Sequence, residues 1–208
     1  MMMAPNVAEP RRRLIDAAIA VFGEFGFRGA TTRRIAEEAG VNEVTLFRLF
    51  GSKSALLEEA VKHSQSTVSR RADTFLPPEP GDPQAEIEAW AREHWKSIRD
   101  RRSVIRKMMS EIEEHPEISA TLTQGWDRVR GGVTQYLEQL RDRGEIAADA
   151  PITTAVAMFT GVLFADAICR DIKRGAYPPE KQAVTEYTQL FLRSLKYEAK
   201  RETNGASR

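Results

Sequence analysis

The chain has 208 residues, of which 41% are hydrophobic and 29% are charged, and its formal net charge is +1. This composition is typical of a soluble globular protein and excludes an intrinsically disordered chain. The single cysteine, Cys169, excludes an internal disulfide, and the three scattered histidines show no spacing typical of a metal site. No apolar run follows the first methionines, so we expect a cytoplasmic protein without a signal peptide. No cofactor is expected either.

The first 74 residues predict four helices, of which the second and third are unusually short. Apolar residues recur at helical spacing, and no stretch alternates as a half-buried strand does. Gly40 and Gly51 are suited to ending helices, whereas Thr31 or Thr32 and then Asn42 are suited to beginning them. The four helices are therefore expected at residues 11–25, 32–39, 43–50 and 53–74.

The composition changes at residues 75–84, FLPPEPGDPQ, where four prolines and a glycine exclude a continuous helix and indicate a linker. Five further helices are expected after it, at residues 85–101, 104–114, 117–143, 152–173 and 180–199. The fourth of these is the most apolar, and a membrane span needs about 20 predominantly apolar residues. Because this stretch also contains threonines and Asp166, we predict a buried helix and no membrane span.

The two short helices need support from a neighbour, since isolated helices of this length are not stable in water. Their apolar side chains can share a small core with the first helix. The expected core residues are Leu14, Ala18, Phe22, Ile35, Ala36, Ala39, Val41, Leu46 and Phe50. Two short helices joined at a glycine and supported by an earlier helix form a helix-turn-helix, here over residues 32–50. This motif directs the N-terminal end of its second helix into the major groove of DNA.

The residues that can contact double-stranded DNA lie in and around this motif. Hydroxyl groups at a helix N-terminus suit a phosphate, guanidinium groups grip guanine or phosphate, and Val44 can touch a thymine methyl group. Glu43 can accept a hydrogen bond from cytosine or only favour the helix N-terminus. Arg11–Arg13 form either a basic arm that reaches DNA or a solvated terminus, and each arginine taken singly is compatible with an ordinary solvated face. The predicted DNA contacts are Thr31, Thr32, Arg33, Arg34, Asn42, Glu43, Val44, Thr45, Phe47, Arg48 and Lys53.

Residues 11–61 resemble the DNA-binding domain of the TetR family of bacterial transcriptional regulators. The resemblance rests on AAIAVFGEFGFRGATTRRIAEEAGV followed by TLFRLFGSKSALL, a pattern far more specific than a general helix-turn-helix. Three positions depart from the family. Members often have a small residue at the position of Val44, usually a tyrosine at that of Phe47, and a histidine or tyrosine at that of Leu49. The family's tyrosine contacts a phosphate, and Phe47 lacks that hydrogen bond, which is worth about 1 kcal/mol.

The resemblance implies a DNA-binding domain at 10–52, a connecting helix at 53–74, and a regulatory domain at 83–200 that binds a small-molecule effector between its central helices. Bulky side chains are candidates for lining this pocket, although each is also compatible with a plain core position. The candidates are Trp90, Trp95, Met108, Met109, Trp126, Phe159 and Phe164. Glu111 and Asp166 can face a cationic ligand, but we favour paired or solvated carboxylates.

The helices at 152–173 and 180–199 carry more apolar surface than one face can bury. Pairing with the same two helices of a second copy gives a four-helix interface, and the resemblance implies such a homodimer. A two-fold dimer holds its two reading helices one or more DNA turns apart, which suits a palindromic operator.

We therefore expect an all-α transcriptional regulator, a repressor that leaves its operator when an effector binds. A DNA-binding regulator without an effector and a transcriptional activator remain alternatives. An enzyme is not expected, because the sequence has no catalytic triad pattern, no phosphate-binding loop and no metal-ligand spacing.

Overall fold

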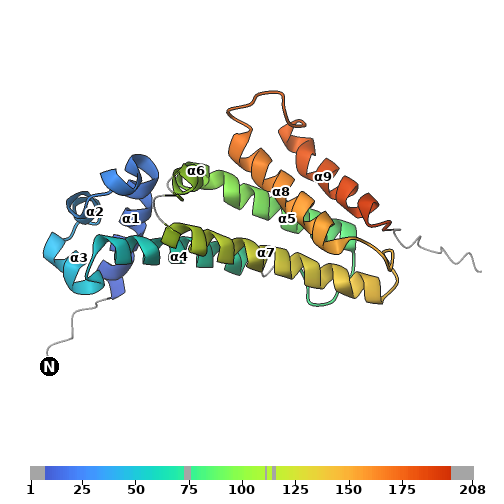
Figure 1. Cartoon of the computed structure of the whole chain (residues 1–208), viewed down its shortest axis with the longest axis horizontal. Helices are drawn as coiled ribbons and strands as arrows, with labels where there is room; N and C mark the ends of the chain where they lie inside the picture. The colour runs from blue at the N-terminus through green and yellow to red at the C-terminus, as the bar shows by residue number, and fades with distance from the viewer. Residues whose placement is uncertain (1–7, 73–75, 111, 114–115, 198–208) are drawn as a thin grey trace, which may run out of the picture. The chain divides into compact units, whose positions relative to one another are not determined.

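The computed structural model describes residues 8–72, 76–110, 112–113 and 116–197. All regular secondary structure within these ranges is helical (Figure 1), which confirms the predicted all-α fold. The helices are α1 (Ala8–Gly29), α2 (Thr32–Glu38), α3 (Glu43–Phe50), α4 (Lys53–Ala72), α5 (Pro83–Asp100), α6 (Arg102–Ser110), α7 (Pro116–Asp142), α8 (Ile152–Cys169) and α9 (Glu180–Ser194). Positions 73–74, 114 and 198–199 of the expected helices lie outside the described residues, as does Glu111.

The described residues form two compact units. Unit 1 contains residues 8–71 and 97–128, and therefore holds α1 to α4, α6 and the first part of α7. Unit 2 contains residues 72–96 and 129–197, and therefore holds most of α5, the rest of α7, α8 and α9. By its packing α6 belongs with the helix-turn-helix, although it follows the proline-rich stretch in the sequence. The predicted functional boundaries at 52, 74 and 83 stay a prediction.

The first helix, α1, begins earlier than expected and bends near its end. Gly26 has φ 70°, in the left-handed region that favours glycine, and a short turn continues from it to Gly29. Because α1 starts at Ala8, Arg11–Arg13 lie within the helix. The alternative of a basic arm preceding the first helix is therefore wrong. Arg12 is instead paired along the helix with Glu9, at 2.8 Å.

The core of unit 1 joins α1, α2, α3, α4 and α6. Leu14, Ile35 and Leu46, one from each of the first three helices, are fully buried together, which confirms the predicted shared core. Met108 of α6 belongs to the same cluster and is 4% exposed. Gly23 lets α6 approach α1 closely, since a Cβ atom at position 23 would lie only 2.7 Å from Cγ2 of Val104.

Three of the described helices end in one type of turn, the Schellman motif, in which a residue with positive φ follows the last helical turn. In α2 this residue is Gly40 (φ 63°), and the N–H of Val41 donates to the carbonyl of Ala36 at 3.0 Å. The corresponding residues are Gly144 (φ 69°) after α7 and Lys196 (φ 54°) after α9. This turn ends α9 before the expected position 199, and the sequence could not indicate it because a lysine carries no signal for such a turn.

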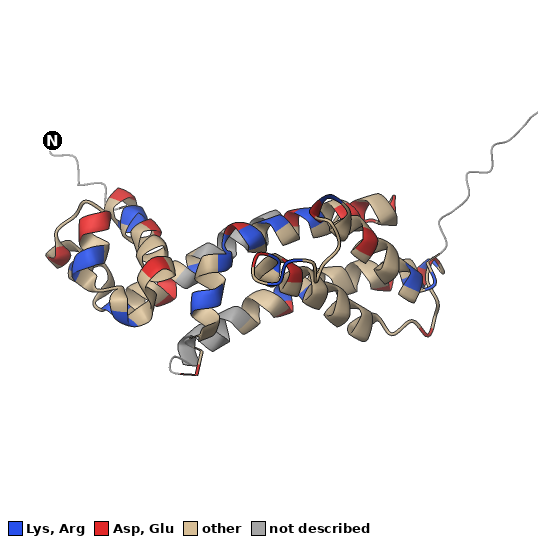
Figure 2. Ribbon diagram, turned by 90° about the horizontal axis from the view of Figure 1, so that it is seen from above, with Lys and Arg blue, Asp and Glu red and all other residues tan. Residues whose placement is uncertain are grey.

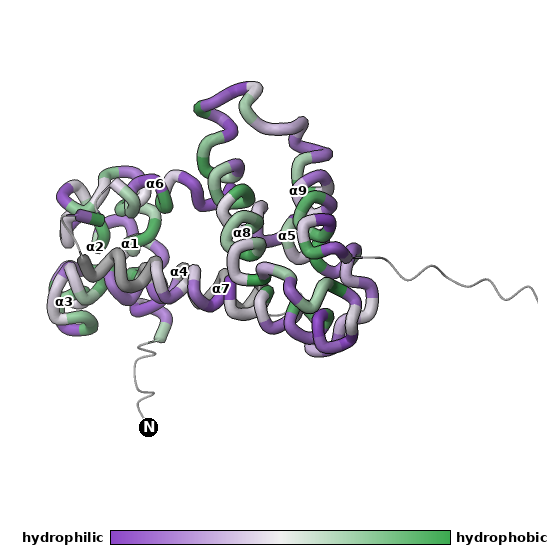
Figure 3. The backbone as a smooth tube through the Cα atoms, turned by 45° about the vertical axis from the view of Figure 1, so that its right-hand side comes forward, coloured by the Kyte–Doolittle hydropathy of each residue, from purple (hydrophilic) through white to green (hydrophobic). Residues whose placement is uncertain are grey.

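In unit 2, α8 and α9 lie against each other and are connected at one end by residues 170–179 (Figure 1). Hydrophobic residues are distributed along both helices (Figure 3). Phe159 of α8 stacks on Phe191 of α9 with ring centroids 4.2 Å apart. Trp90 of α5 lies 6.2 Å from Phe159 and stacks on His94 at 5.0 Å. Aromatic rings therefore join α5, α8 and α9 in the core of this unit.

Within the described ranges, α8 is the helix that is long and apolar enough to cross a membrane, but half of it is buried by the protein itself. Its Asp166 is fully buried. Arg170 donates to both oxygens of this carboxylate, at 2.6 and 2.5 Å, and the hydroxyl of Tyr187 donates to it at 2.8 Å. The prediction of a paired carboxylate is confirmed for Asp166, and a core helix explains the apolar composition of α8.

The surroundings of this carboxylate change the acidity of its partners. Burial raises the pKa of the Tyr187 phenol above its ordinary value, as do its hydrogen bond to Asp166 and the negative charge there. The hydrogen bond to Asp166 raises the pKa of Arg170, whose Nη1 also donates to the carbonyl of Pro178 at 2.7 Å. Both shifts strengthen the protonated forms that a phenol and a guanidinium already have at neutral pH.

Candidate nucleic-acid interface

The two short helices of unit 1 are fixed at their N-terminal ends by side chains. The hydroxyl of Thr31 accepts from the N–H of Arg34 at 3.2 Å, and the side-chain oxygen of Asn42 accepts from the N–H of Val44 at 2.8 Å. These bonds satisfy amide groups that have no partner within the helix. The predicted N-caps are therefore confirmed, with Thr31 rather than Thr32 in that position.

The first residue of α3 is tied to α2. The hydroxyl of Thr32 donates to the carboxylate of Glu43 at 2.5 Å, so the starts of α2 and α3 are joined directly. Glu43 lies in the first turn of α3, where a negative charge is favourable. In this arrangement Glu43 orients α3. Its predicted contact with cytosine stays a prediction.

The outer face of α3 is exposed and partly apolar. Leu46 points into the core and is fully buried, whereas Val44 and Phe47 are 72% and 47% exposed. Arg48 follows Val44 by one helical turn, is exposed, and makes no side-chain hydrogen bond or ion pair that the structure records among the described residues. These three side chains form what we call the α3 face. Thr45, half-buried, lies between its members in the sequence.

The basic residues of α2 have partners inside unit 1. Arg33 is paired with Glu37 at 2.8 Å, and this hydrogen bond and charge raise the pKa of the guanidinium. Arg34 donates to the carbonyl of Gly29 at 3.1 Å and lies over the ring of Phe25, 4.5 Å from its centroid. A guanidinium has five N–H groups, so both arginines keep donors for a phosphate.

Lys53, at the start of α4, also has an internal partner. Its ammonium donates to the carbonyl of Phe27 at 2.8 Å and lies 4.3 Å from the centroid of that ring. It therefore supports the turn after the bend of α1. Figure 2 shows acidic segments interspersed with basic ones along these helices, so unit 1 does not carry one sign of charge alone.

The structure divides the predicted pocket residues between the two units. Trp90, Trp95 and Phe159 are buried in unit 2, where Phe164 is half-buried. The other three belong to unit 1. Met108 is buried in the core there, and Met109 and Trp126 are each 44% exposed. Trp90 and Phe159 lie side by side in unit 2, with ring centroids 6.2 Å apart. The role of all seven residues in ligand binding stays a prediction.

Comparison with known proteins places both parts of the chain in one family. Residues 14–60 match the model of the bacterial regulatory proteins of the tetR family. Residues 77–176 match that of the tetracyclin repressor-like C-terminal domain. Together the two models span more than half of the chain.

Three relatives illustrate the similarity. The transcriptional regulator UidR of Escherichia coli (strain K12) is 28% identical over 181 residues, which cover 81% of this chain and 87% of UidR. The transcriptional repressor AcnR of Corynebacterium efficiens is 27% identical over 146 residues, covering 68% of this chain and 71% of AcnR. The structure of the fatty acid degradation regulator FadR from Bacillus halodurans superposes with a TM-score of 0.71 at 19% identity, covering 95% of this chain and all of FadR.

The helix-turn-helix, its exposed α3 face and both family models lead to the same conclusion. Members of this family bind DNA operators and typically dimerise and bind small-molecule effectors. The chain belongs to the tetR family of bacterial regulatory proteins and is a DNA-binding transcriptional regulator.

Proposed function

We propose that α3 is the helix that reads DNA, and that the contacts come from the predicted set between Thr31 and Lys53. The observation that carries this proposal is the α3 face: Val44 and Phe47 are exposed on an eight-residue helix, beside Arg48. Clustered exposed apolar side chains indicate a binding surface. Val44 and Phe47 suit thymine methyl groups, and the guanidinium of Arg48 suits a guanine edge or a phosphate.

The test begins with a duplex that the wild-type chain selects from a random-sequence library. Binding to this duplex and to a scrambled duplex of equal length is then measured by fluorescence anisotropy across a salt series. For Arg48→Ala we expect about a tenfold loss of affinity, the usual size of one good guanidinium contact. Lys96→Ala is the control, because it removes one positive charge from an exposed position of unit 2 that lies outside α8 and α9. Equal effects of the two changes would refute the role of Arg48.

Phe47 offers a second test in the opposite direction. Phe47→Tyr restores the hydroxyl that the family uses against a phosphate, at a side chain that is 47% exposed. We expect affinity for the selected duplex to rise about fivefold, the equivalent of one hydrogen bond. Phe47→Leu, which keeps an apolar side chain without the hydroxyl, should not show this rise. An unchanged affinity in Phe47→Tyr would mean that position 47 faces no phosphate.

We further propose a homodimer through the surfaces of α8 and α9, at the predicted ranges 152–173 and 180–199. Met158 and Leu190, one on each helix, are 71% and 62% exposed, and a second copy would cover them. Met158→Glu with Leu190→Glu should halve the mass measured in solution by light scattering. Val44→Glu is the control, because it places a glutamate on an equally exposed apolar position of unit 1. A dimeric double variant would refute this interface.

The regulatory part of the proposal is a cytoplasmic repressor that leaves a palindromic operator when a small molecule binds near Trp90, Trp95 and Phe159. It is supported by the match of residues 77–176 to a tetracyclin repressor-like domain and by the repressor AcnR among the relatives. An effector must bind the DNA-free form more tightly than the DNA-bound form. Compounds that change the tryptophan fluorescence should therefore also release the selected duplex. Quenching without release would favour a regulator whose DNA binding no effector controls.

A further inference from the structure

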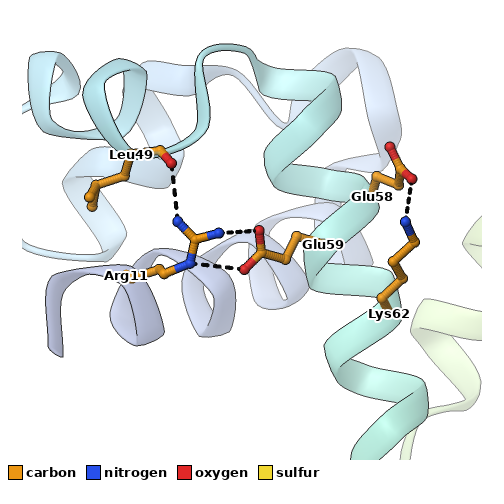
Figure 4. Close-up of polar contacts among 5 residues, drawn as sticks. All are labelled: Arg11, Leu49, Glu58, Glu59 and Lys62. Carbon is orange, nitrogen blue, oxygen red and sulfur yellow. Dashed lines mark hydrogen bonds and ion pairs between the residues drawn. The ribbon is translucent and has the colours of Figure 1, made fainter. Parts of the chain in front are cut away.

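One guanidinium in unit 1 joins three helices (Figure 4). Nε and Nη2 of Arg11, on α1, donate to the two carboxylate oxygens of Glu59, on α4, at 3.0 and 2.5 Å. Nη1 of the same side chain donates to the carbonyl oxygen of Leu49 at 3.1 Å. The guanidinium carbon also lies 4.6 Å from the ring centroid of Phe50. Arg11 therefore contacts the last turn of α3 at two residues while it is held by α4.

The contact with Leu49 matters because of where that carbonyl lies. The last four carbonyl groups of a helix have no partner within it, and they carry the negative end of the helix dipole. A guanidinium at this end satisfies one of them and is favourable electrostatically. The other end of α3 is fixed by Asn42 and by the bond between Thr32 and Glu43. The short helix that carries the α3 face is thus held at both ends by named side chains.

The geometry points to Arg11 as a positioning residue for α3: we propose that Glu59 sets the orientation of the reading helix through Arg11, so that the position of α4 is passed to α3. This inference rests on the proposed reading of DNA by α3. Arginine is required because its planar fork binds the carboxylate in two places and still donates to a carbonyl. A lysine ammonium cannot reproduce this arrangement.

A rival explanation is that Arg11 simply attracts DNA by its charge. The two explanations predict opposite effects on DNA affinity when the carboxylate of Glu59 is removed. If only charge matters, removing this carboxylate frees the guanidinium and strengthens binding to any DNA. If Arg11 positions α3, removing the carboxylate weakens binding to the selected duplex and leaves binding to the scrambled duplex nearly unchanged.

The chain offers a matched control on the adjacent residue. Glu58 accepts from Lys62 at 2.5 Å, but this pair lies within α4 and does not reach α3 (Figure 4). The side chains of Glu58 and Glu59 are exposed to a similar degree, 45% and 37%. Glu58→Gln and Glu59→Gln therefore remove the same charge from neighbouring positions, and only the second breaks the link to Arg11.

The first measurement is the affinity of full-length Arg11→Gln, Arg11→Lys, Glu59→Gln and Glu58→Gln for the selected and scrambled duplexes across a salt series. We expect about a three- to tenfold loss on the selected duplex alone for the first three, the effect of losing one or two hydrogen bonds. The slope against salt should not change, and Arg11→Gln with Glu59→Gln should lose no more than either alone. Glu58→Gln should stay within about twofold of wild type.

Two results would overturn the proposal. One is a loss on both duplexes in Arg11→Gln with a salt slope reduced by about one, as for a direct phosphate contact. The other is tighter binding by Glu59→Gln, equal to that of Glu58→Gln. Melting temperatures of all variants check that they fold. Should Arg11→Gln fail to fold, Glu59→Gln and Arg11→Lys still decide the question.

A second measurement does not depend on DNA. Amide hydrogen exchange at residues 46–51 reports how firmly the end of α3 is held. We expect faster exchange there in Arg11→Gln and Glu59→Gln and wild-type exchange in Glu58→Gln. Equal exchange in all three would overturn the proposal. A wild-type chain that selects no duplex would refute the reading role of α3 instead, and the exchange experiment would still decide whether Arg11 positions this helix.

Discussion

The short helices α2 and α3 of unit 1 and the apolar helices α8 and α9 of unit 2 are held in different ways. In unit 1, α2 and α3 have only 7 and 8 residues, and each begins at a side chain that accepts a hydrogen bond from the helix backbone. In unit 2, α8 and α9 have 18 and 15 residues, and both begin after prolines, Pro151 and Pro179, without a side-chain cap. Short helices bury too little surface to define their own ends, whereas α8 and α9 are held by the apolar surface that they bury.

The two units also use charge differently. In unit 1, the side chains of Arg11 and Glu59 are 40% and 37% exposed, so their pair is screened by water and mainly sets geometry. In unit 2, Asp166 is fully buried and the side chain of Arg170 is 17% exposed. Removing one member of a buried ion pair leaves the other charge without a partner and strongly reduces stability. The core of unit 2 therefore depends on both residues.

The largest expected effect tests this dependence. Asp166→Ala leaves the guanidinium of Arg170 poorly solvated and removes the acceptor of Tyr187. We expect the free energy of unfolding to fall by about 3 kcal/mol, as for other buried pairs that lose one partner. Urea denaturation followed by circular dichroism measures it. Asp149→Ala, at an exposed acid of the same unit, should change little. Equal losses in the two variants would mean that burial of the pair has no energetic consequence.

The next effect tests whether α6 belongs with α1. Gly23→Ala places a Cβ 2.7 Å from Cγ2 of Val104, and a β-branched side chain has few rotamers with which to avoid it. We expect a loss of about 2 kcal/mol, typical of overpacking. Adding Val104→Ala should recover part of this loss. Gly132→Ala, where no neighbour lies within 4 Å, is the control and should be neutral or slightly stabilising. Without any recovery in the double variant, the close approach of α6 to α1 is wrong.

A smaller effect tests the capping of the short helices. Asn42→Ala removes the bond to the N–H of Val44 and should reduce stability by about 1 kcal/mol. Asn42→Ser keeps a capping oxygen and should recover most of the loss. The melting temperature and the affinity for the selected duplex should fall together in Asn42→Ala, because the same bond orients α3. A fall in affinity alone would mean that Asn42 contacts DNA and contributes little as a cap.

The smallest effect concerns an exposed pair within one helix. Glu58→Gln breaks the ion pair with Lys62, and pairs of this kind contribute about 0.3 kcal/mol. We expect no change in melting temperature beyond experimental error. A loss of stability comparable to that of Asp166→Ala would mean that exposed and buried ion pairs contribute equally to the stability of this protein.

Much of unit 1 could be predicted from the sequence because its signals are local. Gly40, Gly51 and Asn42 fix helix ends within a few residues, and the structure has them in those roles. The end of α9 could not be predicted, since Lys196 adopts a positive φ that its residue type does not signal. Local chemistry is visible in the sequence, whereas a conformation imposed by the surrounding fold is not.

The contacts between distant segments could not be predicted from the sequence, for another reason. Arg11 and Glu59 are 48 residues apart, and nothing in either stretch indicates the other. Met108 has the same apolar character whether it lines a pocket or fills the core of unit 1, where the structure has it. Residue type identifies bulky side chains, but the choice of packing partner depends on the whole fold.

The position of α6 in unit 1 has a consequence for gene fusion and chimera design. A recombinant regulator assembled by joining a foreign effector domain at the proline-rich stretch would leave out the segment 97–128. Leu14 and Phe22 belong to the cluster that Met108 helps to fill. An N-terminal module without α6 would therefore expose apolar side chains to solvent. The transferable module is discontinuous in the gene: a graft must carry α6 along with the first four helices, or supply a substitute that fits against Gly23.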